Sequence, residues 1–464
     1  MNKFRKLFLL LKSKSIRYTI YRLTYEIERR SGLLSRKFPT SPPKIGLPSL
    51  AEWRSKEAVY LFDDRNSINI KREKESKLKN NFECVLDGKV QFFSSQWYDL
   101  GHDYDWVTNL SNGYRYDFSK HWTSIESLSK EAGDIKFLWE PSRFSWLYTI
   151  VRYDYHYNED HFDFLLSKIL DWINKNPLNC GPNYKCSQEI SVRVLNWLFA
   201  LNFYKNSKLL TEEKWQVIIN SIYWQIDHVY NNINFSRIAV RNNHAITETL
   251  TLYLIGLMFP EFKEASKWKK KGKRWFEQEV DYQIDGDGAY IQNSMNYHRV
   301  VIQLLSLGIA LADKNDEKFC DEVYRKAYKS VNFLYQFQNL KNGFMPNYGA
   351  NDGALFFQFN DCSYVDYKPQ LDALHILLTG RKLYGEVYED SNWLCATPKR
   401  SMFKPITQQL GQISFNESGY HLIRDGESLT FLRAGSFKGR FAQADQLHID
   451  IWYGSENILF DGGS

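Results

Sequence analysis

The sequence lacks several patterns that would assign it to a common class. Its 464 residues include six cysteines, at positions 84, 180, 186, 320, 362 and 395, with no Cys-x-x-Cys pair and no metal-ligand spacing. A glycine-rich phosphate loop, a dinucleotide fingerprint and a nucleic-acid-binding module are also missing. These absences argue against a disulfide framework, a nucleotide cofactor and a nucleic-acid partner, and we expect mostly buried thiols.

Long apolar runs are missing as well. No stretch approaches the length of a membrane span, and the run Leu7–Leu11 is too short for a signal-peptide core. Residues 1–40 nevertheless contain eleven Lys or Arg and two Glu, although the whole chain has a net charge of only +6. This basic, amphipathic segment predicts either contact with an anionic membrane surface or docking on the rest of the protein. We therefore expect a cytoplasmic or membrane-peripheral location.

Aromatic residues, in contrast, are abundant. They make up 16% of the chain, with 14 Trp, 30 Tyr and 31 Phe, within a composition that is 43% hydrophobic and 25% charged. Such a chain is long enough for two to three domains with a sizeable core. Most of these rings are core residues, but aromatic faces also bind the apolar faces of sugar rings.

The hydrophobic pattern divides the chain into four regions. Residues 1–40 form the basic segment, residues 41–90 read as a linker and irregular cap, residues 91–390 as a helical domain, and residues 405–464 as a β-domain. Short loops between amphipathic helices indicate antiparallel neighbours, hence a helical-hairpin array, open or closed into a toroid. The expected helices include residues 188–204, 212–230, 244–258, 262–283, 297–313, 317–338 and 366–379.

After Pro405 the period becomes two. Asp425-Gly426 forms a hairpin turn, and along residues 446–452 the pattern places Leu447 and Ile449 on one face and His448 and Asp450 on the other. The few strands end in an apolar edge at residues 458–460, so the sheet looks incomplete. We therefore expect the segment after about residue 405 to be the first part cleaved by protease, and the isolated chain to self-associate.

Two short polar blocks precede apolar helical runs that do not need them. The first is Arg241-Asn242-Asn243-His244, followed by Glu248, and the second is Asn296-Tyr297-His298-Arg299. Amide, imidazole, phenol and guanidinium groups at the mouths of two packed helices suit a base-catalysed elimination on an acidic sugar. The structural alternative is that Asn243 caps a helix and Tyr297 packs between helices.

With three further segments, these blocks carry a resemblance to a known family. The ordered motifs 139–144, 241–248, 288–299, 351–353 and 444–462 resemble those of heparinase II/III polysaccharide lyases, and the basic N-terminal segment resembles that of members found near surface-polysaccharide genes. The resemblance implies an α+β multidomain fold in which an α/α toroid, here incomplete, precedes an antiparallel β-sandwich. The polysaccharide would bind in the cleft between them, and a periplasmic location becomes the family-based alternative.

The resemblance also implies residue roles. Asn243 and Tyr297 fall on the family's carboxylate-neutralising Asn and catalytic Tyr, and an amide and an imidazole suit Asn243 and His244 to neutralise a uronate. Tyr297 would give or take the proton. Its ordinary pKa is about 10, so we expect it to need a cationic neighbour such as Arg299 or Arg241 to act as a base near neutrality.

The third catalytic partner departs from the family pattern. Family members carry a histidine-rich stretch before an Ala-Asp pair, which supplies a catalytic His and, in some, a zinc ligand. Phe441 and Gln443 stand where those histidines would be, and a lone Asp461 is a poor zinc site. We therefore expect no zinc and no other cofactor. His448 is the nearest imidazole and could substitute as acid or base, or be structural.

The sequence therefore predicts a lyase that cleaves an acidic, uronate-containing polysaccharide by β-elimination, and it leaves the oligomeric state open. A toroid glycosidase using Asp352 with Glu248, a non-catalytic polysaccharide-binding or assembly protein, and a truncated inactive remnant are the rivals. The basic run 267–274 could attract an acidic polymer, but such runs are usually solvated faces. The expected substrate-binding residues are Trp139, Glu140, Arg143, Arg241, Asn242, Glu248, His298, Arg299, Asn351 and Asp352.

Overall fold

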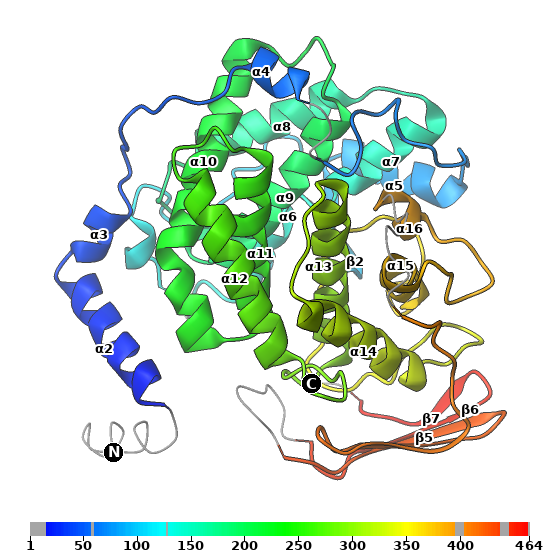
Figure 1. Cartoon of the computed structure of the whole chain (residues 1–464). Helices are drawn as coiled ribbons and strands as arrows, with labels where there is room; N and C mark the ends of the chain where they lie inside the picture. Colours follow the sequence, from blue (N-terminus) through cyan, green and yellow to red (C-terminus); the bar gives the residue numbers. More distant parts are fainter. Residues whose placement is uncertain (1–14, 57–59, 127–128, 395–402, 437–444, 463–464) are drawn as a thin grey trace.

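A ring of helices with a sheet against one end makes up the molecule (Figure 1). The computed structural model describes residues 15–56, 60–126, 129–394, 403–436 and 445–462. Most residues of the hydrophobic core belong to the helical domain, and the sheet follows this domain in the chain. The principal helices are α5 (Ser76–Leu86), α6 (Lys136–Ser142), α7 (Leu147–Tyr157), α8 (Phe162–Lys175), α9 (Ser187–Phe203), α10 (Glu212–Asn234), α11 (Asn243–Met258), α12 (Ala265–Gln283), α13 (Met295–Lys314), α14 (Asp321–Phe337) and α15 (Lys368–Thr379).

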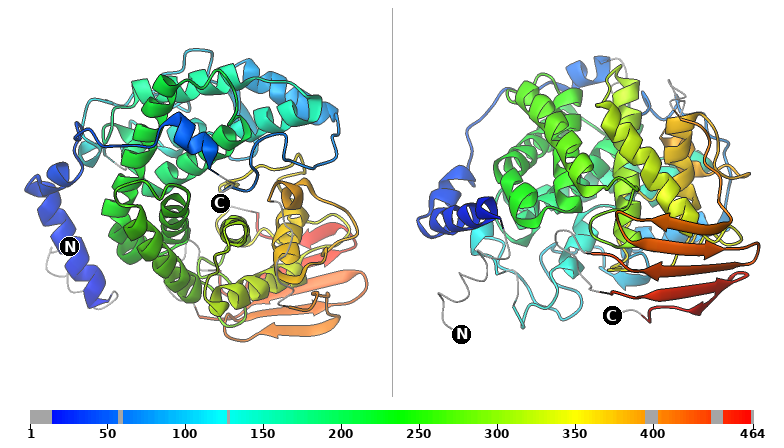
Figure 2. Two further views of the ribbon diagram at one scale, coloured as in Figure 1. Left: turned by 45° about the horizontal axis from the view of Figure 1, so that its top comes forward. Right: turned by 60° about the horizontal axis from the view of Figure 1, so that its bottom comes forward.

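The helices form two layers, as expected of a toroid of hairpins (Figure 2). Every residue of α9 is buried, and α11 and α13 are buried over nearly their whole length, so these three are inner helices. Helices α10, α12 and α14 are amphipathic and cover them from outside. Because each inner helix follows an outer one, α9, α11 and α13 run parallel, and their N-termini lie at one end of the ring.

The region expected to be a linker and irregular cap is partly helical. Helix α4 (Leu50–Ser55) begins with a Ser49–Glu52 capping box, and α5 packs on α7 through Leu78, Phe82 and Val85. The sequence pattern did not predict α5, because the charged run at residues 71–75 directly before it is typical of a loop. A two-stranded hairpin of β1 (Lys89–Phe92) and β2 (Gln96–Asp99) follows, and short helices α16 (Glu389–Trp393), η1 (Trp122–Ser124) and η2 (Pro182–Tyr184) complete the helical domain.

The C-terminal region is a single antiparallel sheet in the described residues, with strands in the order β3-β4-β5-β6-β7. The alternation predicted for residues 446–452 is present, and the face with His448, Asp450 and Trp452 packs against the helices. The opposite face exposes apolar side chains such as Ile423 and Ile449. The strands are β3 (Gly411–Phe415), β4 (Tyr420–Arg424), β5 (Ser428–Arg433), β6 (Ile449–Tyr453) and β7 (Glu456–Leu459).

The described part of the basic segment is helix α2 (Ile16–Arg30), followed by α3 (Leu33–Lys37). Helix α2 lies at the margin of the ring and contacts the π-helical turn η3 (Phe235–Val240) (Figures 1 and 2). Residues 1–14, which held the rest of the predicted amphipathic helix, are outside the described residues. No helix in the described ranges is both long and apolar enough to cross a membrane.

Candidate functional site

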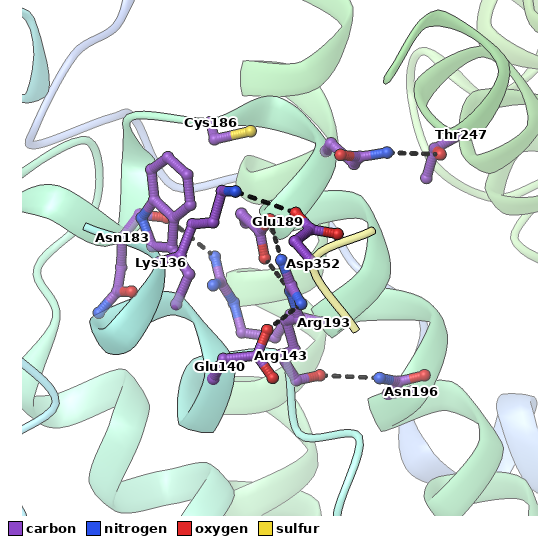
Figure 3. A network of polar contacts seen from close by, with 12 residues as sticks. Lys136, Glu140, Arg143, Asn183, Cys186, Glu189, Arg193, Asn196, Thr247 and Asp352 are labelled. Carbon is purple, nitrogen blue, oxygen red and sulfur yellow. Dashed lines mark hydrogen bonds and ion pairs between the residues drawn. The ribbon is translucent and has the colours of Figure 1, made fainter. Parts of the chain in front are cut away.

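One face of the short helix α6 supplies three charged side chains to the end of the ring where the inner helices begin. Lys136, Glu140 and Arg143 follow at intervals of four and three residues, so they share that face. Arg143 donates to Glu140 and, through Nε and a terminal nitrogen at 2.5 and 2.9 Å, to both oxygens of Glu189 in the first turn of α9 (Figure 3). Glu140 and Arg143, both expected to bind substrate, therefore form an ion pair, with Glu189 as a second acid.

A tyrosine–aspartate–lysine chain lies beside this cluster. Tyr297 Oη donates to Asp352 Oδ2 at 2.7 Å, and Lys136 Nζ donates to the same oxygen at 2.9 Å. The other oxygen, Oδ1, is buried and accepts no hydrogen bond from the described residues. Three separate segments, α6, α13 and the loop after α14, thus meet at one carboxylate.

The charges around this chain set its protonation. Burial raises the pKa of Tyr297 well above its usual value, the Asp352 charge and hydrogen bond raise it further, and Arg143 only partly opposes them. Burial alone would also raise the pKa of Asp352, but Lys136 and the Tyr297 hydrogen bond outweigh it and leave this pKa below its usual value. At neutral pH the pair is a phenol beside a carboxylate.

The cations expected to act on Tyr297 lie elsewhere. Arg299 donates to Tyr364 O and Asn296 Oδ1, and its guanidinium lies 4.0 Å from the ring centroid of Tyr367. Arg241 pairs with Glu279 at 3.3 Å. Residue 299 projects to a different side of α13 from residue 297. The cation whose charge acts on Tyr297 is Arg143, while Lys136 acts on Asp352.

Asn243 does not cap a helix, which was the structural alternative to a catalytic role. Asn242 is the N-cap of α11, and its Oδ1 accepts from His244 N at 3.1 Å. Asn243 is 1% exposed, and its Oδ1 has no hydrogen-bond partner among the described residues. Arg241, just before, has a left-handed φ of 48° at the end of η3, a strained turn of the kind found at functional sites.

Helix ends add a positive potential at the same place. Ser294 caps α13 by accepting from Tyr297 N at 3.1 Å, and Asn242 caps α11. The positive ends of both helix dipoles therefore lie beside Asn243 and Tyr297, where they favour a bound carboxylate.

Two cavities flank α6. One, of about 610 Å³, is lined by Trp139, Cys186, His244 and Glu248, and His244 Nδ1 lies 3.7 Å from Cys186 Sγ. The other, of about 380 Å³, is lined by Glu140, Arg143 and Arg299 among others. Burial raises the pKa of Glu248 to about 8, opposed only by the hydrogen bond from Ser236, so it is mostly protonated at neutral pH.

His448 reaches the helical domain from the sheet. Its ring lies 5.1 Å from that of Tyr348, whose carbonyl accepts from Met295 N at the start of α13. His448 Nε2 is buried, forms no hydrogen bond in the described ranges, and lies 4.0 Å from Asp450 Oδ2. His448 is thus connected to the Tyr297 helix through Tyr348, and among the described residues it forms no hydrogen bond or ring contact with Tyr297 itself.

Two other predicted residues support the site from behind. His298 is buried between the rings of Tyr290 and Phe333, and burial lowers its pKa to about 3, so it is a neutral packing residue. Asn351 accepts from Gly353 N and from Tyr364 Oη, which shapes the turn that carries Asp352.

Comparison with known proteins identifies this architecture. The family model for the heparinase II/III N-terminus matches residues 50–357. The chain belongs to the heparinase II/III family. It is 23% identical over 323 residues to a heparin-sulfate lyase of Bacteroides stercoris and 25% identical over 270 residues to one of Bacteroides thetaiotaomicron. These alignments cover 64% and 55% of this chain but only 44% and 36% of the relatives.

Solved structures of heparinases share the fold. The crystal structure of heparinase III superposes with a TM-score of 0.61 at 16% identity, covering 89% of this chain and 62% of that one. The heparan sulfate lyase of Pedobacter heparinus gives 0.52 at 18% identity, with 89% and 60% covered. The toroid followed by a β-domain is therefore the heparinase fold.

The family resemblance raises the question of a zinc site. The described residues contain no group of three His, Cys, Asp or Glu side chains arranged to hold a metal ion. Phe441 and Gln443, on which the expectation of no zinc rests, lie outside those residues.

Sequence reasoning missed Lys136 and Glu189. Lys136 lies 216 positions from Asp352, and Glu189 lies 46 positions from Arg143, so no local pattern joins them. The one available signal was the spacing of Lys136, Glu140 and Arg143 on a single helical face.

Proposed function

We propose that this heparinase-family chain cleaves an acidic, uronate-containing polysaccharide by β-elimination. The observation that carries the proposal is the Tyr297–Asp352–Lys136 chain, set beside Arg143 and the unpartnered amide oxygen of Asn243. The names of the heparin-sulfate lyase relatives support the same substrate class.

Elimination divides into three tasks. The carboxylate at C5 must be neutralised, the C5 proton must go to a base, and O4 must leave with a proton while the C4–C5 double bond forms. The Asn243 amide, the His244 imidazole and the positive ends of α11 and α13 suit the first task. Lys136 and Arg143 add positive charge nearby.

Tyr297 suits the proton transfer to O4. Its raised pKa keeps it a neutral phenol, and a phenol can donate to a departing alkoxide. To take the C5 proton itself, Tyr297 would first pass its own proton to Asp352, whose lowered pKa opposes this. We therefore assign the base role to an imidazole, with His448 as the candidate.

A glycosidase is less well supported. It needs one protonated and one charged carboxyl group facing a shared bond. Glu248 is the protonated one, but it accepts from Ser236, whereas Asp352 is bound by Lys136 and Tyr297, and no hydrogen bond joins the two carboxyl groups in the described residues.

The reaction type is tested directly by its product. Incubation with heparan sulfate and with other uronate polymers should produce unsaturated ends that absorb in the near ultraviolet. New reducing ends without that absorbance would show hydrolysis, and binding without any new ends would show a non-catalytic polysaccharide-binding protein.

We also propose that α2 contacts an anionic membrane surface. Ile16, Ile20, Leu23 and Ile27 lie on one face of α2 and are 52–75% exposed. The helix docks on η3 through Tyr25, whose ring lies 5.5 Å from that of Phe235. An exposed apolar stripe with arginines beside it matches the charge and depth of an anionic bilayer interface.

A further inference from the structure

The outer face of α12 presents cations held over aromatic rings. Lys267 Nζ lies 4.6 Å from the ring centroid of Tyr230, and Lys271 Nζ lies 5.6 Å from that of Trp275. Arg237 lies over the same Trp275 ring at 4.6 Å, and Arg241 over Tyr282 at 3.2 Å. We call this surface the cationic track and define it by five cations: Arg237, Arg241, Lys267, Lys271 and Arg274.

Positive charge exceeds negative charge along the track. Arg237 and Arg241 share one buried carboxylate, Glu279, at 3.6 and 3.3 Å, and Lys267 pairs with Glu264 at 3.1 Å. Lys271 bonds the Tyr230 hydroxyl instead of an acid. Among the described residues, two carboxylates pair with cations of the track and a third, Asp227, is close enough to Lys267 to interact with its charge. Three carboxylates thus face five cations, so the surface retains a capacity for added anions.

The crowding is greatest around Arg237. Burial lowers its pKa, and after the opposing effect of Glu279 the positive charges of Arg17, Arg241 and Arg274 lower it further. Arg237 Nε is buried and faces Glu279 Oε1 at 3.6 Å, beyond hydrogen-bond length. A negative group bound at the surface near these cations would relieve their mutual repulsion.

The track begins at the site and leads away from it. Arg241 immediately precedes the Asn242–Asn243 start of α11, and Tyr282 is at the same end of α12. Lys267 is fifteen residues earlier on this helix, about 22 Å from Tyr282 at the α-helical rise. The distance exceeds what a single sugar unit needs.

The geometry points to the cationic track as an extended binding surface for an acidic polysaccharide chain, outside the cleavage site. Carboxylates or sulfates of the chain contact the cations, and a sugar face lies on the ring of Tyr282, which is 44% exposed. Because the aromatic rings already hold the cations in place, binding orders fewer side chains. The polymer class rests on the proposed function.

The same helix supplies a matched control. Lys269 and Lys273 both pair with Glu317, at 2.6 and 2.9 Å, on another side of α12. Removing Lys267 and Lys271, or Lys269 and Lys273, subtracts the same charge from one helix, but only the first pair lies on the track. The two double variants separate the track from general electrostatics.

The test measures binding in a Tyr297→Phe background, to limit cleavage, with long heparan sulfate chains and a heparan sulfate tetrasaccharide as probes. Lys267→Ala/Lys271→Ala should lower the ratio of long-chain to tetrasaccharide affinity by about tenfold, and should flatten the dependence of long-chain affinity on salt. Lys269→Ala/Lys273→Ala should leave that ratio within about twofold of the parent. Circular dichroism should confirm that both variants fold.

Equal losses in the two double variants, or no loss in the first, would overturn the track. The track would also be overturned if Lys267→Ala/Lys271→Ala lost binding to anionic vesicles but kept its polysaccharide binding, because the track would then serve a lipid surface. The proposed function fails separately: if the wild type cleaves no polymer but the first variant still loses long-chain affinity, the track stands and the lyase does not. If the wild type cleaves the polymer but Lys267→Ala/Lys271→Ala keeps its long-chain affinity, the lyase stands and the track does not.

Discussion

Tyr297 and Asp352 share a hydrogen bond of 2.7 Å although they lie on different segments, and Lys136 completes the chain from a third. Burial and this contact both raise the pKa of Tyr297, so it stays a phenol well above neutral pH. The hydrogen bond also orients the Tyr297 hydroxyl. Its proton points at Asp352 until a substrate oxygen takes the place of the carboxylate as acceptor.

Removing only that hydroxyl tests its catalytic role. Tyr297→Phe preserves the ring and should lower kcat by at least about a hundredfold, since positioned proton transfer contributes factors of that order or more. Tyr204→Phe is the control, because Tyr204 also donates to a buried aspartate, Asp154, in another part of the ring. The control should lose stability and keep kcat; equal kcat losses in both variants would make the Tyr297 effect structural.

Asp352→Asn tests how the carboxylate tunes the phenol. The amide keeps an acceptor for Tyr297 but removes the negative charge, so the pKa of Tyr297 should fall. If Tyr297 donates the proton, the alkaline limb of the kcat profile should move to lower pH. An alkaline limb that moves to higher pH in an active Asp352→Asn enzyme would contradict the role of Tyr297 as the acid.

Local patterns predicted the elements well, and distant contacts are where prediction stopped. The expected helix at 212–230 begins at the observed residue of α10, and the hairpin at Asp425-Gly426 joins β4 and β5, because periodicity and turn chemistry are local. The sequence could indicate Asn243 and Tyr297 because each lies in a short, uninterrupted run of polar residues. Lys136 and Glu189 act through partners far along the chain, which no short window contains.

The inner-layer position of His298 and Arg299 shows the same limit. Both belong to the polar block that pointed to Tyr297, yet each residue along a helix turns by about 100°. Only Tyr297 faces Asp352, while His298 lies between Tyr290 and Phe333. Sequence proximity could not distinguish a side chain in the site from one that supports it.

Glu248 should make the helical domain less stable as pH rises. Its pKa is about 8 in the folded chain, against about 4.5 for an ordinary Glu, so between these values the folded state holds a proton that the unfolded state has lost. More protons bound in the folded state means that the free energy of unfolding falls with rising pH. Glu248→Gln, which mimics the neutral acid, should flatten the curve of Tm against pH from about 4.5 to 8. A wild-type curve already matching the variant would contradict a protonated Glu248.

The exposed stripe of α2 gives the last prediction. Ile20 and Ile27 are 59% and 65% exposed, and each should bury apolar area when α2 lies in a bilayer interface. The full chain should sediment with phosphatidylglycerol vesicles and much less with phosphatidylcholine vesicles, and salt should weaken the binding. Ile20→Glu/Ile27→Glu should reduce the bound fraction at least about tenfold, because two buried apolar contacts are lost and two negative charges are added.

Leu209→Glu/Val217→Glu is the control, since those side chains are 45% and 43% exposed away from α2 and receive the same charges. Equal losses in the two variants would reduce the effect to net charge, and no loss in the first would leave α2 without a membrane role.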